Sequence, residues 1–485
     1  MARKRQLRAL VVVTAVWLLW AGWYLLTSSG DVEIRIVDDL GSPVAGAIVS
    51  HQGDEVGRTD TTGTLAVGRS RGTLDVSAPG FQAGWIDLDR QGPHVVRMNP
   101  HVARGVVTDD AGRPVEGATV TVGYGTAVTD RQGFYSVRLA EPGPVSIWRP
   151  AWSRGDYEWD GSPGTIGVSI EPMDVRAVHV TGEKAGDPVG WKEMLELAER
   201  TELNGIMLDL KDEDGRVFYD TAVETANRVG SVDPLFDLAS RVRDARDAGL
   251  YLIGRLVTFQ DPIAARAVPE MAITDSTTGD PYNKRGQYFL DPTDPDARAY
   301  ALALADEACR LGVDEIQFDY VRYPDGFGPE AVFDGGSDYE ARVETIRSFL
   351  EEARALLHAG DCVVAGDIFG FITAAQDDGG IGQQWEVVSS VLDVVSPMIY
   401  PSHYDDGWYG YDDPQANPGP MVDRALRQGL DRLATGAVVR PWLQDFSYDE
   451  GQVRAQIDAA EGHGLGWMLW NAASEVTVDA LQPAR

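Results

Sequence analysis

The C-terminal two thirds of the chain alternate between short apolar runs and longer segments with helical periodicity. The apolar runs are largely hydrophobic on both faces, which is typical of parallel strands covered by helices on both sides. The intervening segments, such as 190–202, 233–249 and 338–360, repeat apolar residues every three or four positions. We therefore predict eight strands, at residues 176–182, 205–212, 251–259, 314–323, 362–370, 394–402, 438–446 and 466–472.

Eight strands that alternate with helices over about 300 residues indicate an α/β fold, the (β/α)₈ TIM barrel. An open doubly wound sheet would more often place a glycine-rich phosphate-binding turn after its first strand. The turn at this place is TGEKAGDP (181–188), which lacks that pattern. The barrel is therefore the favoured architecture.

Polar and aromatic residues interrupt the predicted strands near their C-terminal ends, where TIM-barrel active sites lie. In DEIQFDYVRYP (314–324), Gln317 and Asp319 alternate with apolar residues and so share one face. A single inward polar residue is usually a hydrogen-bonding partner in the core, but all eight strands carry one at the same end. The predicted substrate-binding residues are His179, Asp209, Lys211, Arg255, Gln317, Arg322, Tyr400, His403, Trp408, Gln444, Trp470 and Asn471.

Asp319 and Asp367 are the two residues that we expect to carry the chemistry. They end neighbouring strands with the same inward parity, and two carboxyl groups flanking a cleft are the minimum for glycoside hydrolysis. We assign Asp319 as nucleophile or ionised stabiliser and Asp367 as acid/base, with Arg255 and Arg322 placed to keep one carboxyl ionised. Their separation would decide between retention and inversion of the anomeric centre.

The loop SHYDDGWYGYDDP (402–414) is rich in aromatic residues amid acids. Flat rings such as Trp408 can pack against sugar faces while carboxylates accept hydrogen bonds from hydroxyl groups. The alternative is a loop that folds on its own aromatic cluster.

Four segments together resemble a bacterial family of glycoside hydrolases whose barrels are related to those of α-amylases. They are LDLKDEDG (208–215), DEIQFDYVRYP (314–324), AGDIFG (365–370) and SPMIYPSHY (396–404). The resemblance covers roughly residues 173–475. It implies the barrel fold, with Asp319 in the fourth-strand nucleophile place and Asp367 in the fifth-strand acid place.

Three positions depart from the amylase-like pattern. Gln317 stands where those enzymes carry an arginine, and Asp367 stands where the acid is usually a glutamate. Their seventh-strand aspartate has only Gln444 or Asp445 as a counterpart. The resemblance therefore supports the fold more strongly than the mechanism, and it does not identify the substrate.

Residues 31–150 contain an internal repeat. DLGSPVAGAIV (39–49) matches DAGRPVEGATV (110–120), and TDTTG (59–63) matches TDRQG (129–133), at an offset of about 70 residues. Short strands with this turn chemistry predict two β-sandwich modules. The repeats resemble carboxypeptidase-regulatory-like domains, transthyretin-like and immunoglobulin-like sandwiches found on secreted bacterial proteins, which implies a stalk.

The N-terminus carries a targeting signal. Basic residues in MARKRQLR precede 9–26, an uncharged stretch long enough to span a bilayer as a helix with its basic end in the cytoplasm. A cleaved signal peptide is the alternative, but bulky tryptophans and the lack of an A-x-A site favour an uncleaved anchor. The predicted domains are a membrane anchor, two β-sandwich modules and the catalytic barrel, at 1–30, 31–100, 101–168 and 169–485.

The net charge and the sequence motifs limit the classes of partner, cofactor and metal that we expect the chain to bind. The net charge of −33, from 75 acidic and 42 basic residues, argues against nucleic-acid binding. We predict no cofactor and no metal, because G-x-S-x-G, H-E-x-x-H and P-loop motifs are missing and DLKDEDG breaks the calcium-loop register. Cys309 and Cys362 would lie on neighbouring units at the bottom of the barrel, so a disulfide there is a hypothesis for an oxidising compartment.

The leading hypothesis is a membrane-anchored, extracytoplasmic glycoside hydrolase that acts on an envelope or environmental polysaccharide or oligosaccharide. The main alternative is a catalytically silent barrel that binds glycans, held on an adhesive stalk. A third reading is hydrolysis of another bond, such as an amide, by the same carboxyl groups.

Overall fold

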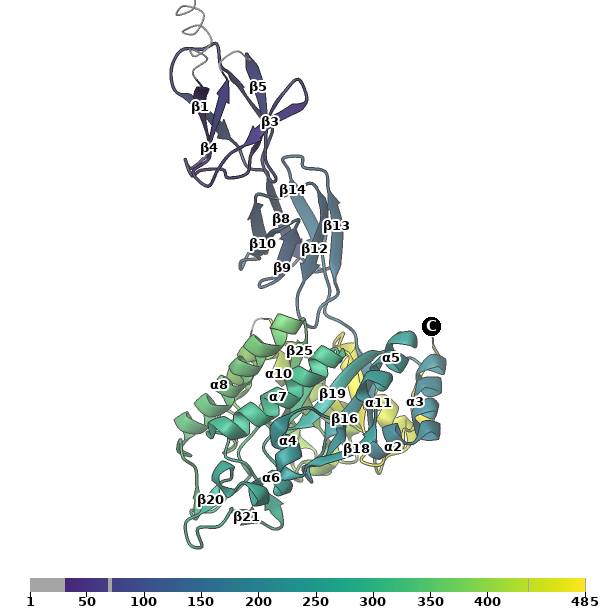
Figure 1. Ribbon diagram of the computed structural model, residues 1–485. Helices are drawn as coiled ribbons and strands as arrows, with labels where there is room; N and C mark the ends of the chain where they lie inside the picture. The colour runs from purple at the N-terminus through teal and green to yellow at the C-terminus, as the bar shows by residue number, and fades with distance from the viewer. Residues whose placement is uncertain (1–30, 69–71, 435, 485) are drawn as a thin grey trace, which may run out of the picture. The chain divides into compact units, whose positions relative to one another are not determined.

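The computed structural model describes residues 31–68, 72–434 and 436–484, which fall into two compact units (Figure 1). The first unit contains the described residues up to Arg149 together with Arg154–Glu171, and the second contains Pro150–Ser153 and Pro172 onward. The predicted membrane segment at 9–26 lies outside the described residues. Among the helices that are described, none has the length and apolar character needed to cross a bilayer.

The first unit consists of two β modules, each built from a three-stranded and a four-stranded sheet. The first module has the sheets β4-β1-β7 and β3-β2-β5-β6, and the second has β11-β8-β14 and β10-β9-β12-β13. The strands of the first are β1 (Asp31–Asp38), β2 (Ile48–His51), β3 (Asp54–Arg58), β4 (Thr64–Gly68), β5 (Thr73–Ser77), β6 (Gly84–Asp87) and β7 (His94–Met98). Those of the second are β8 (Val102–Thr108), β9 (Thr119–Val122), β10 (Gly125–Val128), β11 (Phe134–Arg138), β12 (Gly143–Trp148), β13 (Gly155–Trp159) and β14 (Thr165–Ser169).

The two modules repeat the same buried threonine contact, which supports the internal repeat seen in the sequence. Thr59 Oγ1 donates to the Val44 carbonyl at 2.7 Å, and Thr129 Oγ1 donates to the Val115 carbonyl at 2.7 Å. Each threonine starts the Thr-Asp-x-x-Gly turn, so the shared motif fixes the same local structure twice.

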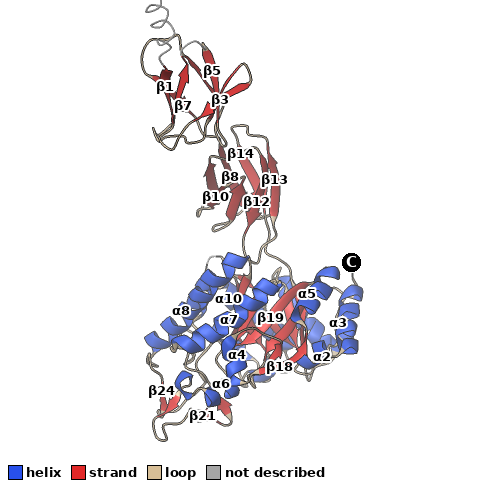
Figure 2. Ribbon diagram, in the orientation of Figure 1, coloured by secondary structure: helices blue, strands red, loops and turns tan. Residues whose placement is uncertain are grey.

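The second unit is a parallel β/α barrel, with helices outside the strands (Figure 2). Parallel pairing runs in the order β15-β16-β19-β23-β25-β26-β28-β29 and closes from β29 back to β15. The eight predicted strands are therefore confirmed. Their bounds are β15 (Arg176–Val180), β16 (Gly205–Lys211), β19 (Tyr251–Val257), β23 (Glu315–Asp319), β25 (Val363–Phe369), β26 (Val394–Ile399), β28 (Trp442–Gln444) and β29 (Trp467–Trp470).

The seventh strand is split. β27 (Val438–Val439) and β28 both pair with β26, and Pro441 between them has no backbone N–H for the ladder. An antiparallel hairpin adds β17 (Val217–Tyr219) to β16, and β18 (Val232–Phe236) pairs with β17.

The helices surround this sheet and bury a continuous apolar layer against its outer face. They are α2 (Gly182–Gly186), α3 (Pro188–Arg200), α4 (Glu224–Val229), α5 (Leu238–Asp247), α6 (Pro262–Ala267), α7 (Pro295–Leu311), α8 (Tyr339–Leu357), α9 (Trp385–Val391), α10 (Pro418–Asp431) and α11 (Glu450–Gly462). The loops also form β20 (Thr274–Asp275), β21 (Asn283–Lys284), β22 (Gln287–Tyr288), β24 (Ala331–Val332) and the 3₁₀ turns η1 (Pro269–Met271), η2 (His358–Gly360), η3 (Gly370–Thr373), η4 (Pro401–His403), η5 (Trp408–Gly410) and η6 (Val478–Ala480).

One predicted helix starts later than expected. The pattern placed a helix over 233–249, but β18 occupies the beginning of that range and α5 starts at Leu238. Pro234 disfavours helical backbone in the residue before it, and α5 begins after Asp237, which is the N-cap residue but makes no side-chain capping hydrogen bond.

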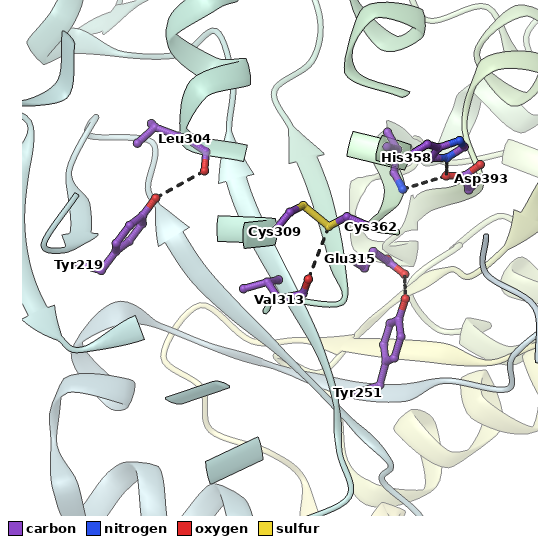
Figure 3. The surroundings of a disulfide bond; sticks show 10 residues. Tyr219, Tyr251, Leu304, Cys309, Val313, Glu315, His358, Cys362 and Asp393 are labelled. Carbon is purple, nitrogen blue, oxygen red and sulfur yellow. Dashed lines mark hydrogen bonds and ion pairs between the residues drawn. A yellow bond between two sulfur atoms is a disulfide. The ribbon is translucent and has the colours of Figure 1, made fainter. Parts of the chain in front are cut away.

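A disulfide joins Cys309, near the C-terminal end of α7, to Cys362, which directly precedes β25 (Figure 3). The two Cα atoms lie 5.9 Å apart. Nearby, Tyr251 donates to the buried carboxylate of Glu315 at 3.1 Å. The bond thus fastens a helix to the start of the strand that carries Asp367 at its other end.

Candidate active site

A cavity of about 670 Å³ opens at the C-terminal ends of the barrel strands. It brings together eight of the predicted site residues, which come from five strands and the loops that follow them. These are Arg255, Asp319, Arg322, Asp367, Tyr400, His403, Trp408 and Trp470. Its other lining residues are Glu213, Tyr320, Phe369, Gly370, Phe371, Met398, Tyr404, Asp405 and Trp442.

Asp319 is held at both carboxyl oxygens. Oδ2 accepts hydrogen bonds from Arg255 Nε at 2.9 Å and Nη2 at 2.6 Å, while Oδ1 accepts from the backbone N–H of Tyr320 at 2.7 Å. Tyr320 has a φ of 50°, a left-handed conformation that is uncommon for a residue other than glycine. The turn at the end of β23 therefore contributes directly to fixing this carboxylate, and such strain is typical of functional sites.

Arg255 is neutralised from both sides. Its Nη1 donates to Asp209 Oδ1 at 2.9 Å, and Asp209 Oδ2 lies 2.9 Å from His179 Nε2. His179 Nδ1 lies 2.8 Å from the Asn471 carbonyl oxygen, so both ring nitrogens face oxygen atoms that can accept hydrogen bonds. Burial raises the pKa of Asp209, but the charges of His179 and Arg255 outweigh it and lower the pKa to about 2.

Asp367 has the opposite surroundings. Its Oδ1 accepts hydrogen bonds from Trp442 Nε1, at 2.6 Å, and from Gln317 Nε2. Burial, followed by the negative charge of Asp319, raises the pKa of Asp367 well above its ordinary value, and the contacts with Trp442 and Gln317 offset this only in part. Asp367 therefore keeps its proton to a higher pH than an ordinary aspartate does.

The two carboxyl groups lie side by side because their strands do. β23 and β25 pair in parallel up to Phe318 and Gly366, so Asp319 and Asp367 follow in register. One site thus holds a carboxyl group whose pKa is raised by burial beside a second carboxyl group that accepts hydrogen bonds from an arginine.

Six predicted residues do not line the cavity. His179, Asp209 and Gln317 lie behind its lining and take part in the hydrogen bonds described above, whereas Lys211, Gln444 and Asn471 have other partners. Lys211 forms a buried ion pair with Asp261 at 3.0 Å, because the pairing of β16 with β19 shifts between Asp209 and Lys211 and breaks the alternation of faces. The Gln444 amide serves the backbone: Oε1 accepts from Ser402 N–H at 3.1 Å and Nε2 donates to the Phe446 carbonyl. Asn471 Nδ2 donates to the Asp445 carbonyl.

The expectation that Arg322 keeps one of the two carboxyl groups ionised is not met by direct contact. Its ion pair in the described residues is with Asp325, and Arg255 alone pairs with Asp319.

Trp442 lines the cavity but was not among the predicted site residues, although it lies two residues before Gln444 on the same strand face. An aromatic residue inside a barrel ordinarily indicates core packing, so the residue type of Trp442 did not indicate a site residue. Its position on the inward face of the strand did. Glu213 was also missed; its carboxylate lies 3.6 Å from Arg255 Nη2.

The aromatic loop packs on itself and also reaches the cavity. The Trp408 ring lies 5.4 Å from that of Tyr404 and 6.0 Å from that of Tyr409. Tyr404 and Trp408 line the cavity as well. The loop therefore forms an aromatic cluster of its own, and the packing of its rings against a sugar stays a prediction. Within the described ranges, no group of three or more His, Cys, Asp or Glu residues is arranged to hold a metal ion.

Comparison with solved structures gives matches to several proteins. A hypothetical protein from Ruminiclostridium thermocellum is 32% identical over 39% of this chain and 96% of its own, with a TM-score of 0.36. The PgaB (BpsB) glycoside hydrolase domain from Bordetella bronchiseptica is 16% identical over 64% and 99%, with a TM-score of 0.48. The glycoside hydrolase domain of PelA from Pseudomonas aeruginosa is 12% identical over 62% and 96%, with a TM-score of 0.37.

No curated protein matches the chain. The family model described as "Putative glycosyl hydrolase domain" matches residues 177–476, which is more than half of the chain and includes the barrel strands from β15, except for its first residue Arg176, to β29. The chain belongs to this glycosyl hydrolase domain family.

Proposed function

We propose that the barrel hydrolyses a glycosidic bond, with Asp367 as general acid and Asp319 as the ionised nucleophile or stabiliser. The observation that carries the proposal is the contrast between two neighbouring carboxyl groups on one cavity. Burial keeps Asp367 protonated, while Arg255 and the Tyr320 N–H hold Asp319 as an acceptor. This is the pair of protonation states that glycoside hydrolysis requires.

In the proposed reaction, the Asp367 proton moves to the glycosidic oxygen as the bond from that oxygen to the anomeric carbon breaks. Positive charge develops at the anomeric carbon and the ring oxygen, and the negative charge of Asp319 stabilises it. A water molecule then supplies the hydroxyl group to the anomeric carbon and returns a proton to the site. Arg255 positions Asp319 because it is itself held by Asp209 on its other side.

The cavity walls suit a sugar. Aromatic rings from Tyr400, Trp408, Trp442 and Trp470 line a space that also presents carboxyl and guanidinium groups. Rings pack against the apolar faces of sugars, and the polar groups bind their hydroxyls. We therefore propose a polysaccharide or oligosaccharide of the cell envelope or the surroundings as the substrate.

The proposed location is outside the cytoplasm, with the protein anchored by a helix at 9–26. The disulfide between Cys309 and Cys362 supports an oxidising compartment. The proposed domain limits are 31–100, 101–168 and 169–485, with the two β modules as carboxypeptidase-regulatory-like spacers between the membrane and the barrel.

A glycan panel with detection of new reducing ends tests the proposal. The full chain is compared with Asp319→Asn and Asp367→Asn, and with Asp306→Asn, an aspartate that pairs with Arg310 on the outside of α7, as the matched control. Turnover by the wild type and the control, lost by roughly 10²-fold or more in both site variants, is expected. Glycan binding without turnover by any of the four proteins would favour a silent binding barrel instead.

A further inference from the structure

Arg322 is a buried cation that the proposed mechanism does not use. It follows β23, lines the cavity, and leaves only 7% of its side chain exposed. Its guanidinium lies against three rings: Phe369 at 4.6 Å, Tyr320 at 4.9 Å and Phe289 at 5.7 Å from the ring centroids. These contacts hold the planar group in place through cation–π attraction.

The charge of Arg322 is poorly compensated. The carboxylate paired with it belongs to Asp325, at 3.5 Å, and the side chain of Asp325 is 59% exposed. Lys284 shares this partner, with its Nζ 3.6 Å from Asp325 Oδ2. Two cations therefore share one solvated carboxylate, whereas Arg255, which is similarly buried, pairs with two buried carboxylates, those of Asp209 and Asp319. A buried charge without a close partner is costly, and burial lowers the pKa of Arg322.

The guanidinium group of Arg322 also has donors that form no hydrogen bond with the described residues. Among the described residues, the guanidinium makes one hydrogen bond, from Nη1 to the Tyr323 carbonyl at 3.1 Å. Nε and Nη2 of Arg322 have no hydrogen-bond partner among the described residues, and neither atom is fully enclosed by protein. A guanidinium edge with two free donors matches the two oxygens of a carboxylate.

We infer that Arg322 binds a carboxylate substituent on one sugar residue of the substrate. This inference rests on the proposed function, because it takes the occupant of the cavity to be a glycan. A bound carboxylate would accept from both free donors and supply the missing negative charge inside the aromatic frame. A neutral acceptor, such as an acetamido carbonyl, would supply hydrogen bonds but no charge.

The rest of the cavity limits how acidic that glycan is. Glu213 and Asp405 also line the space, and the whole chain carries a net charge of −33. Long-range repulsion therefore disfavours a polymer with a carboxylate on every residue. The structure assigns the site to a glycan in which a single acidic residue is set among neutral neighbours.

Equilibrium binding to matched oligosaccharide pairs tests this inference. One pair is an oligosaccharide in which glucuronate alternates with a neutral sugar, together with its carboxyl-reduced form; the other is an oligogalacturonide and its reduced form. The full chain with Asp367→Asn, which suppresses turnover, is compared with the same protein carrying Arg322→Met. Arg347→Met is the matched control, because Arg347 pairs with Glu344 on the outer surface of α8.

The alternating acidic oligosaccharide is expected to bind about tenfold or more tightly than its reduced form, and more tightly than the oligogalacturonide. Arg322→Met should abolish this preference, and Arg347→Met should leave it intact. A purely structural role for Arg322 would weaken both members of a pair equally. Arg322→Lys, which keeps the charge but loses the paired donors, should show a reduced preference and guards against misfolding of the methionine variant.

No preference for the charged member in either pair, or a preference that survives Arg322→Met, would overturn the inference, as would a lack of binding to all four oligosaccharides. The outcome separates from that of the proposed function. Wild-type turnover of neutral glycans without a charge preference leaves the hydrolase standing and removes the carboxylate site. Charge-selective binding without turnover supports the carboxylate site and contradicts the hydrolase proposal.

Discussion

Arg255 donates two hydrogen bonds to a single oxygen of Asp319, from Nε at 2.9 Å and from Nη2 at 2.6 Å. The same guanidinium reaches Asp209 with Nη1. One planar group thus joins two buried carboxylates, and a point charge on a flexible stem cannot reproduce that geometry.

Two substitutions of Arg255 should separate its contribution to activity from its contribution to stability. Arg255→Lys keeps a positive charge but cannot hold both carboxylates, so we expect kcat to fall by roughly 10²-fold. Arg255→Met removes the charge as well and should lower the free energy of unfolding by about 3–5 kcal/mol. Steady-state kinetics and urea unfolding measure the two effects. Activity of the lysine variant within about threefold of wild type would contradict the positioning role.

Trp442 should tune the pH dependence of the reaction. The acid must be protonated to act, so kcat/KM should fall as pH rises through the raised pKa of Asp367. The hydrogen bond from Trp442 lowers this pKa. Trp442→Phe removes it, so the basic limb of the profile should move to higher pH. A limb that stays in place, or moves to lower pH, would show that Asp367 is not the titrating acid.

Asp445 should make the barrel less stable at neutral pH than under acidic conditions. Its Oδ1 is buried without a hydrogen-bond partner in the described residues, and burial raises its pKa to about 6. The unfolded chain binds its proton near pH 3.9, so the stabilising contribution is complete below about pH 4 and is lost as pH rises through about 6, by roughly 3 kcal/mol in all.

The Asp445→Asn variant should lose this part of the pH dependence. Unfolding in urea at several pH values, compared with wild type and with the exposed-residue control Asp458→Asn, measures it. Parallel curves for wild type and Asp445→Asn would show that Asp445 titrates normally.

The disulfide should contribute strongly to the stability of the barrel. Cys309 and Cys362 are 53 residues apart in sequence, and closing a loop of that size stabilises the folded state by about 4 kcal/mol in the chain-entropy model. The double variant Cys309→Ser, Cys362→Ser should have a lower Tm that reductant no longer changes, whereas reductant should lower the Tm of the wild type. Two free thiols in unfolded, unreduced wild-type protein would contradict the bond.

The strands and the inward parity of Asp319 and Asp367 could be predicted because strand periodicity depends on neighbouring residues alone. The position of Lys211 could not, since one irregular step in β16 turns its side chain out of the barrel. The surroundings of Arg322 could not be predicted from the sequence either. Phe289 reaches it from a loop more than 30 residues earlier in the chain, and Phe369 from another strand.

The protonation states were the least visible in the sequence. Asp319 and Asp367 are the same residue type in similar strand contexts, and the sequence only suggested which was the acid. Both groups are buried, so what distinguishes them is the identity of the donors around each group, Arg255 for one and the neutral side chains of Gln317 and Trp442 for the other. Those contacts exist only once the barrel has closed.

The most direct measurement is a titration of the aspartate carboxyl carbons by NMR in ¹³C-labelled protein, with Asp367→Asn used to assign the signal of Asp367. We predict a carboxyl signal that remains in its protonated position well above the ordinary aspartate pKa of about 3.9 and that is missing from the variant. A signal from Asp367 that titrates at or below that ordinary value would contradict the division of roles between the two carboxyl groups.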